Sequence, residues 1–145
     1  MASELSKQNF ADDLAELRSL EEASRWELVE KGDLELWATV APEGHSEKYI
    51  ARLHWIEYPG SEPASVKFVS ASGQADDPKA WPNAQGFRPA NLDICANWTR
   101  EGFNLHPEWR GDARFRWTTD GNVLLKSLRY LQHMLDTTYS GRFGG

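Results

Sequence analysis

Apolar residues recur at helical spacing near both ends of the chain. Over residues 6–24 they come three or four positions apart, with charged side chains between them, and the same spacing returns over residues 122–135. The apolar positions are Phe10, Leu14, Leu17 and Leu20 in the first stretch, and Leu124, Leu128, Leu131 and Leu135 in the second. This pattern is typical of amphipathic helices that bury one face. We predict a helix at each end, the second capped by Asp120.

Between these stretches the pattern changes to alternation. Two alternating runs in residues 26–40 flank the turn Lys31-Gly32-Asp33, and a third covers residues 49–56. One side of these runs carries Leu34, Leu36, Ala38 and Val40, and then Tyr49, Ala51, Leu53 and Trp55. A proline-bearing break at residues 58–63 precedes a fourth short run, residues 65–69. A period of two separated by turns predicts a four-stranded antiparallel meander.

Residues 70–119 show little periodicity of either kind and are rich in Gly, Pro, Asn and Asp. The stretch nevertheless holds many aromatic side chains. They are Trp81, Phe87, Trp98, Phe103, Trp109, Phe115 and Trp117. Long loops in compact domains are usually functional or disordered, and aromatic content on this scale favours packing. We therefore predict an α+β fold with a long irregular loop that carries the chemistry.

The composition narrows the class of protein. A chain of 145 residues with 40% hydrophobic content fits one domain, residues 1–145. The net charge is −6 and the sixteen Lys and Arg residues are scattered, which argues against a nucleic-acid partner. The single cysteine, the lack of a membrane-length apolar stretch and an N-terminus unlike a signal peptide predict a cytoplasmic protein that does not enter a membrane.

Metal and cofactor chemistry find little support in the residues. The four histidines show no short ligand spacing, and one cysteine cannot form a thiolate cluster. No glycine-rich run precedes a helix with Lys-Ser/Thr, as a phosphate loop requires. We expect neither a metal nor a cofactor.

The predicted order of elements resembles that of the ubiquitin-conjugating enzyme family, and three patches of sequence carry the resemblance. Residues 58–68 are similar to the family's proline-bearing turn and the Val-x-Phe strand after it. Trp81-Pro82-Asn83 is similar to the family's His-Pro-Asn tripeptide, and Leu92-Asp93-Ile94-Cys95 to the approach to its catalytic cysteine. Trp117-Thr118-Thr119, ahead of residues 123–128, resembles the Trp-Ser/Thr pair before the helix behind the active site.

The sequence departs from the family pattern in three places. Trp81 replaces the histidine, the interval from Asn83 to Cys95 is longer, and residues 96–116 form an insertion before Trp117. Such divergence resembles that of bacterial members from antiphage defence operons. Those operons pair a ubiquitin-like modifier with activating and conjugating enzymes and a deconjugating protease.

The resemblance implies that Cys95 accepts a ubiquitin-like modifier as a thioester from an activating enzyme and passes it to a lysine of a target protein. Thiolates suit both steps because they are good nucleophiles and good leaving groups. Arg88 and Arg100 flank Cys95 in sequence, and either could favour the thiolate. The energy for conjugation would come from the separate activating enzyme.

Other residues are candidates to assist Cys95. The resemblance assigns oxyanion stabilisation to Asn83, and Asn91 and Asn97 are nearer in sequence. Together with Trp81 and His106, Asn91 and Asn97 are also our candidate substrate contacts. Candidates for the base that takes the proton of the attacking amine are Asp93, Glu101, His106 and Asp120. Of these, Asp120 lies nearest the family's usual acidic position, so Cys95, Asn83 and Asp120 form the predicted catalytic set.

Three alternatives remain open at this point. Cys95 could be an inert buried thiol in a catalytically silent member of the fold that only binds a partner protein. It could instead serve a cysteine hydrolase together with His106 or His133. The terminal Gly144-Gly145 resembles the end of a ubiquitin-like modifier, although a flexible tail is the simpler interpretation.

Overall fold

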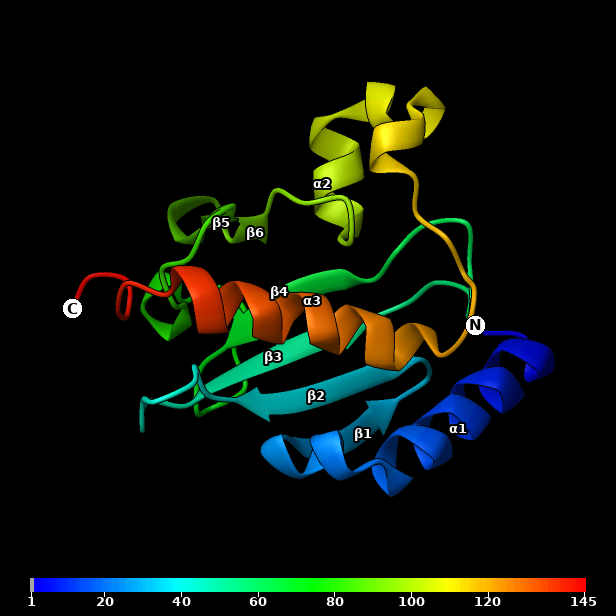
Figure 1. Ribbon diagram of the computed structural model, residues 1–145, viewed down its shortest axis with the longest axis horizontal. Helices are drawn as coiled ribbons and strands as arrows, with labels where there is room; N and C mark the ends of the chain where they lie inside the picture. The colour runs from blue at the N-terminus through cyan, green and yellow to red at the C-terminus, as the bar shows by residue number, and fades with distance from the viewer. Residues whose placement is uncertain (1) are drawn as a thin grey trace.

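The computed structural model describes residues 2–145 and has the predicted α+β architecture (Figure 1). Two long helices, α1 (Glu4–Ser19) and α3 (Val123–Thr138), enclose a core with one antiparallel sheet of order β1-β2-β3-β4. Its strands are β1 (Glu27–Gly32), β2 (Glu35–Val40), β3 (Tyr49–His54) and β4 (Ser65–Val69). In Figure 1, α3 runs across the sheet and residues 96–116 stand to one side of it.

The alternating pattern fixes which face of the sheet is buried, as predicted. Leu36 pairs with Leu53, which pairs in turn with Val66, and all three side chains are fully buried. Residues two positions apart point to the same face of a strand. The inward set is therefore a continuous apolar layer that both helices cover.

The first helix is shorter than its periodicity predicts. Ser3 caps it by accepting a hydrogen bond from the Ser6 amide at 3.1 Å, and the helix ends at Ser19 rather than Ser24. Leu20 is extended, and the 3-10 helix η1 (Glu21–Arg25) follows. The tighter turn buries Ala23 and delivers Trp26 to the core. Tertiary packing thus ends the helix before the sequence pattern does.

The buried Tyr58 joins α1, the β3–β4 turn and α3. Its hydroxyl donates to Asp13 Oδ2 at 2.5 Å and accepts from the Leu124 amide at 3.0 Å, and its own amide donates to Ser6 Oγ at 3.0 Å. Burial, reinforced by the bond to Asp13, raises the pKa of Tyr58 far above its ordinary value. The phenol is therefore neutral and remains a donor.

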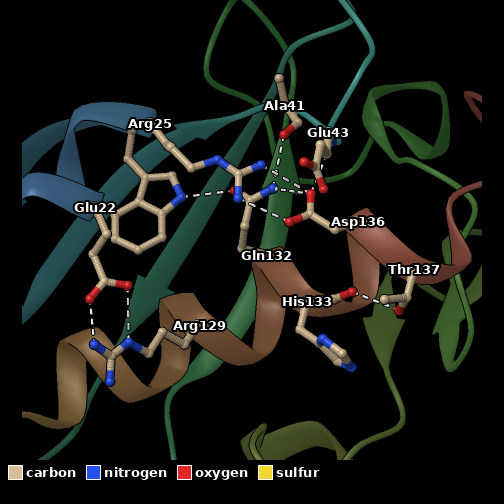
Figure 2. Close-up of polar contacts among 10 residues, drawn as sticks. Glu22, Arg25, Ala41, Glu43, Arg129, Gln132, His133, Asp136 and Thr137 are labelled. Atoms are coloured by element: carbon tan, nitrogen blue, oxygen red, sulfur yellow. Dashed lines mark hydrogen bonds and ion pairs between the residues drawn. The ribbon is translucent and has the colours of Figure 1, made fainter.

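The buried Gln132 fastens the C-terminal half of α3 (Figure 2). Its Oε1 accepts from Trp26 Nε1 at 2.8 Å, while its Nε2 donates to the Ala41 carbonyl at 2.9 Å and to Asp136 Oδ1 at 2.8 Å. Buried amides are costly unless each polar atom is paired. The hydrogen bonds of Gln132 pair both of its polar atoms and join α3 to the segments before β1 and after β2.

The carboxylate of Asp136 lies next to Gln132 and accepts hydrogen bonds from three residues, Arg25, Gln132 and Glu43 (Figure 2). Arg25 contacts both oxygens at 2.9 and 3.0 Å, and the Glu43 amide donates at 2.9 Å. Partial burial opposes the charge, but the bonds from Arg25, Gln132 and Glu43 outweigh it and hold the pKa of Asp136 below its ordinary value. The ionised form of Asp136 therefore stabilises the folded state.

Helix α3 differs from its predicted boundaries at both ends. Asn122, not Asp120, is the N-cap, because its Oδ1 accepts from the Leu125 amide at 3.0 Å while its Nδ2 donates to the Asp13 carbonyl at 2.8 Å. The helix continues past Leu135 to Thr138. The cap is the residue that also reaches α1, which sequence spacing does not reveal.

Residues 70–119 are more regular than the predicted loop. They contain β5 (Phe87–Arg88), which pairs with β6 (Asp93–Ile94), and the helix α2 (Arg100–Leu105). The 3-10 helices are η2 (Pro78–Ala80), η3 (Pro89–Asn91), η4 (Pro107–Gly111) and η5 (Ala113–Phe115). Elements of two to six residues are too short to show a period. Across residues 2–145, every helix falls short of the length and hydrophobicity that crossing a bilayer requires.

Replacing Tyr58 by Phe tests the junction at α1 and α3. The change keeps the ring and leaves the Asp13 carboxylate and the Leu124 amide without their partner. We expect a loss of about 1–3 kcal/mol in the free energy of unfolding, measured by urea denaturation. Tyr130→Phe is the matched control, because the Tyr130 side chain is exposed. Equal stability of the two variants would contradict the role of the Tyr58 hydroxyl.

Asp136→Asn tests the charge at the end of α3. A pKa that is lower in the folded than in the unfolded state contributes stability above the ordinary aspartate pKa of about 3.9 and loses it as the pH falls below that value. We expect the variant to be less stable than wild type at pH 7, and the difference to shrink as the pH falls below about 4. Thermal unfolding as a function of pH measures this, and a pH-independent difference would refute it.

Candidate functional site

Cys95 follows the β5–β6 hairpin directly and is a free, half-buried thiol. In the hairpin Phe87 pairs with Ile94, whose side chain is fully buried. The Cys95 amide donates to the Gly86 carbonyl at 2.8 Å, which extends the pairing by one residue. The hairpin therefore fixes the backbone of Cys95 at the N-terminal end of the cysteine loop.

Thr99 holds the other side of the cysteine loop. Its Oγ1 donates to the Ile94 carbonyl at 2.7 Å and accepts from the Gly102 amide at 3.0 Å, while its amide donates to the Ala96 carbonyl at 3.2 Å. Gly102, in α2, lies so close to the loop that an added Cβ would stand 1.9 Å from the Ala96 oxygen. Only glycine permits this approach. The loop is thus fixed before and after Cys95.

The tip of the hairpin stores backbone strain. Leu92 ends η3 in the left-handed region with φ of 59°, which side chains other than glycine rarely adopt. The Leu92 amide donates to the Pro89 carbonyl at 3.0 Å, and the Leu92 carbonyl accepts from Lys67 Nζ at 2.6 Å. Lys67, on β4, therefore links the sheet to the hairpin three residues before Cys95.

The two arginines that flank Cys95 in sequence bond to other partners. Arg88 forms an ion pair with Asp93, its partner across the hairpin, with Nε and Oδ1 2.8 Å apart. Arg100 donates through Nη2 to the His54 carbonyl at 2.9 Å. Asp93 is accordingly engaged in neutralising Arg88. Neither bond joins an arginine to the Cys95 sulfur, so neither supports the expectation that Arg88 or Arg100 favours the thiolate.

The Trp81-Pro82-Asn83 tripeptide combines a core residue with a surface residue. Trp81 is fully buried and packs edge-on against Phe68, with ring centroids 5.1 Å apart. This corrects the expectation that it contacts substrate, because its side chain presents no surface. Asn83 is half-buried, and its backbone amide donates to the Gly141 carbonyl at 2.7 Å. Gly86, three residues further on, carries the carbonyl that binds Cys95.

The other asparagines lie on the loops beside the cysteine. Asn91 is exposed in η3 at the tip of the hairpin, and Asn97 is half-buried in the turn that follows Cys95. Their placement leaves both as candidate substrate contacts.

Two of the four base candidates, Glu101 and His106, contact other residues of the fold. The Glu101 carboxylate accepts from Ser65 Oγ at 2.6 Å and from the Val66 amide at 3.1 Å. His106 stacks on Trp109 with centroids 4.4 Å apart, and Trp109 stacks on Phe115 at 4.6 Å. Each therefore has a structural function within or beside the insertion.

Asp120 and His133 face a hollow of 490 Å³ on the outer side of α3. Tyr130 is also in its lining and stacks on Trp98, with centroids 6.2 Å apart and planes inclined by 7°. Trp98 follows Cys95 by three residues. The hollow thus adjoins the cysteine loop through Tyr130, a residue that the sequence analysis did not single out.

Among residues 2–145, no three His, Cys, Asp or Glu side chains are grouped so as to hold a metal ion. The residues that fix the site were missed by the sequence analysis because they act through their backbone or through a distant partner. They are Lys67, Gly86, Thr99, Gly102 and Tyr130.

Gly86→Ala tests the hairpin contact to Cys95. Gly86 has φ of 83°, and an added Cβ would lie 3.1 Å from the Cys95 carbonyl oxygen. Gly44→Ala is the matched control, since Gly44 has φ of 77° and open space around its Cβ position. We expect both variants to lose about 1–2 kcal/mol of stability, but only Gly86→Ala to change the rate at which iodoacetamide alkylates Cys95. Identical alkylation rates in the two variants would count against the contact.

Comparison with known proteins finds a match in structure and none in sequence. No family model matches this chain, and no curated protein matches it. A solved structure does match it, that of a ubiquitin conjugating enzyme from Agrocybe aegerita, with a TM-score of 0.62 and 21% sequence identity. The match covers 97% of this chain and 88% of that one. The chain therefore has the fold of a ubiquitin-conjugating enzyme.

Proposed function

We propose that this protein accepts a ubiquitin-like protein as a thioester on Cys95 and transfers it to an amine of a target protein. The observation that carries the proposal is the placement of a half-buried free cysteine on a loop held by its backbone, directly after the β5–β6 hairpin. The chain that presents this cysteine has the fold of a conjugating enzyme. The partners of the reaction are then an activating enzyme, the modifier and a target lysine.

The chemistry needs two acyl transfers and no cofactor. The Cys95 sulfur attacks the carbonyl carbon of the modifier's thioester on the activating enzyme, and the thiolate of that enzyme leaves. An amine of the target then attacks the same carbonyl, a C–N bond forms, and the Cys95 thiolate leaves while the amine gives up a proton to a base. Thiolate as nucleophile and as leaving group makes both steps accessible.

We assign the supporting functions by position. Asn83 is the proposed oxyanion stabiliser, with Asn91 and Asn97 as the alternatives nearer in sequence, because aminolysis builds negative charge on the carbonyl oxygen. Asp120 is the proposed base, since its carboxylate is exposed in the hollow that adjoins the cysteine loop through Tyr130. The cysteine hydrolase with His106 loses support, because His106 is stacked within the insertion, and the version with His133 stays an alternative because His133 lines the same hollow as Asp120.

We further propose that the protein is a bacterial, cytoplasmic member of an antiphage conjugation system. The support is its divergence, since it is 21% identical to the matching enzyme from Agrocybe aegerita and carries Trp81 and the 96–116 insertion. Neighbouring genes for an activating enzyme, a ubiquitin-like protein and a deconjugating protease would support this placement.

A catalytically silent protein-binding module on the same fold is the second candidate. The burial of Trp81 favours it, because the tripeptide of the family places histidine there and this chain uses the position for core packing. The two candidates differ in whether the Cys95 thiol reacts.

Incubation with the cognate activating enzyme, modifier and ATP tests the transferase. We expect wild type to form a conjugate that thiols cleave, Cys95→Ser to form one that resists them because it is an oxygen ester, and Cys95→Ala to form none. Cys95 is the only cysteine in the chain, so no other thiol can replace it. A conjugate on Cys95→Ala would refute the assignment. Absence of any conjugate on wild type, with Cys95 slow to alkylate, would favour the silent module.

A further inference from the structure

Residues 139–143, which we call the C-terminal strap, follow α3 and run antiparallel to the Trp81-Pro82-Asn83 tripeptide. The Asn83 amide donates to the Gly141 carbonyl at 2.7 Å, and the Ser140 amide donates to the Asn83 carbonyl at 2.9 Å. The Phe143 amide donates to the Trp81 carbonyl at 2.9 Å. These three backbone hydrogen bonds and the isolated antiparallel bridge between Pro82 and Arg142 attach the strap to the tripeptide.

Arg142 anchors the strap to the sheet. Its guanidinium donates to Glu47 Oε1 at 2.7 Å, to the Lys79 carbonyl at 2.9 Å and to the Lys48 carbonyl at 3.2 Å. The guanidinium also lies over the ring of Tyr49, 4.4 Å from its centroid. Arginine suits this position because its planar fork can bond in several directions while it stacks on an aromatic face. A single side chain thus joins the strap to the start of β3 and to η2.

The contacts of the strap continue to the cysteine. Thr138, the last residue of α3 before the strap, accepts through Oγ1 from the Gln85 amide at 2.9 Å, two residues beyond Asn83. The next residue, Gly86, supplies the carbonyl that binds the Cys95 amide at 2.8 Å. Residues 83–86 are therefore held on one side by the strap and hold Cys95 on the other. A displacement of the strap would change where Asn83 stands relative to the thiol.

We infer that Arg142 is a positioning residue that acts through Asn83 in the transfer of the modifier from Cys95 to an amine. This inference rests on the proposed function. Attack on the thioester needs the oxyanion donor at a defined place, and a misplacement of about 1 Å can cost up to about 100-fold in rate. Both steps add a nucleophile to the same carbonyl carbon, but the thiolate of the first step attacks more readily than the amine of the second. The strap should therefore affect the second step more than the first.

The structural part of the inference is tested without any partner protein. Hydrogen exchange of the Asn83, Ser140 and Phe143 amides reports whether the strap is attached. We expect Arg142→Ala to speed exchange at these amides while wild type and Arg129→Ala remain slow. Arg129 is the control because it also forms an ion pair between elements, with Glu22, away from the strap. Slow exchange in Arg142→Ala would show that the guanidinium does not hold the strap.

The functional part uses the full-length protein charged with modifier in a single turnover. We expect Arg142→Ala to charge at the wild-type rate and to discharge to free lysine at least about tenfold more slowly. Arg18→Ala should leave discharge unchanged, since Arg18 bonds to the Leu28 carbonyl and lies outside the hollow of Asp120. In an Asn83→Ala background, Arg142→Ala should add no further loss, since it acts through Asn83. Unchanged discharge, or losses that add, would overturn the inference. Failure of wild type to charge would instead remove the proposed function, while the exchange result still reports on the strap.

Discussion

The burial of one face of α3 against the sheet is the constraint on which the rest of the structure depends. Leu124, Leu128 and Leu131 are fully buried in the core formed with the inward face of the sheet. Each such side chain contributes about 1.5–3 kcal/mol on removal from water. The apolar face alone would allow the helix to slide or rotate. Two polar junctions prevent this, one through Tyr58 at the start of α3 and one through Gln132 near its end. Segments that contact α3 are then fixed in position relative to the sheet.

The cysteine loop is one of the parts that α3 and its extension place. Trp98 stacks on Tyr130 of α3, and the strap that follows α3 pairs with the tripeptide before the β5–β6 hairpin. The loop itself is held by backbone bonds, and the charged side chains beside it are paired with each other or with carbonyls. This suits the proposed reaction, in which the modifier arrives already activated as a thioester, because exchange between thiolates depends on the position of the sulfur more than on a strong local base.

The insertion supports the same loop from the other side. The side chains of His106, Trp109 and Phe115 form an aromatic stack, and Arg110 reaches back to Glu62 in the β3–β4 turn at 2.5 Å. This packing holds α2 in place, and α2 carries the Gly102 backbone against Ala96. The aromatic residues of the irregular stretch are thus explained by packing, as their number in the sequence suggested.

The sequence by itself determined the layers of the fold, because alternation and helical spacing state which side chains are buried. It also located Cys95 in the aromatic-rich stretch between the sheet and the closing helix, through short motifs that keep their order in the chain. Only the tertiary structure decided the end of α1, the cap at Asn122 and the short elements of the irregular stretch, since these depend on partners far away in sequence. It likewise decided that Trp81 packs in the core and that Arg88 pairs with Asp93. Residue type and spacing indicate which side chains are buried and where the chain turns. Which groups bond to each other depends on their distance in space, and only folding brings distant residues together.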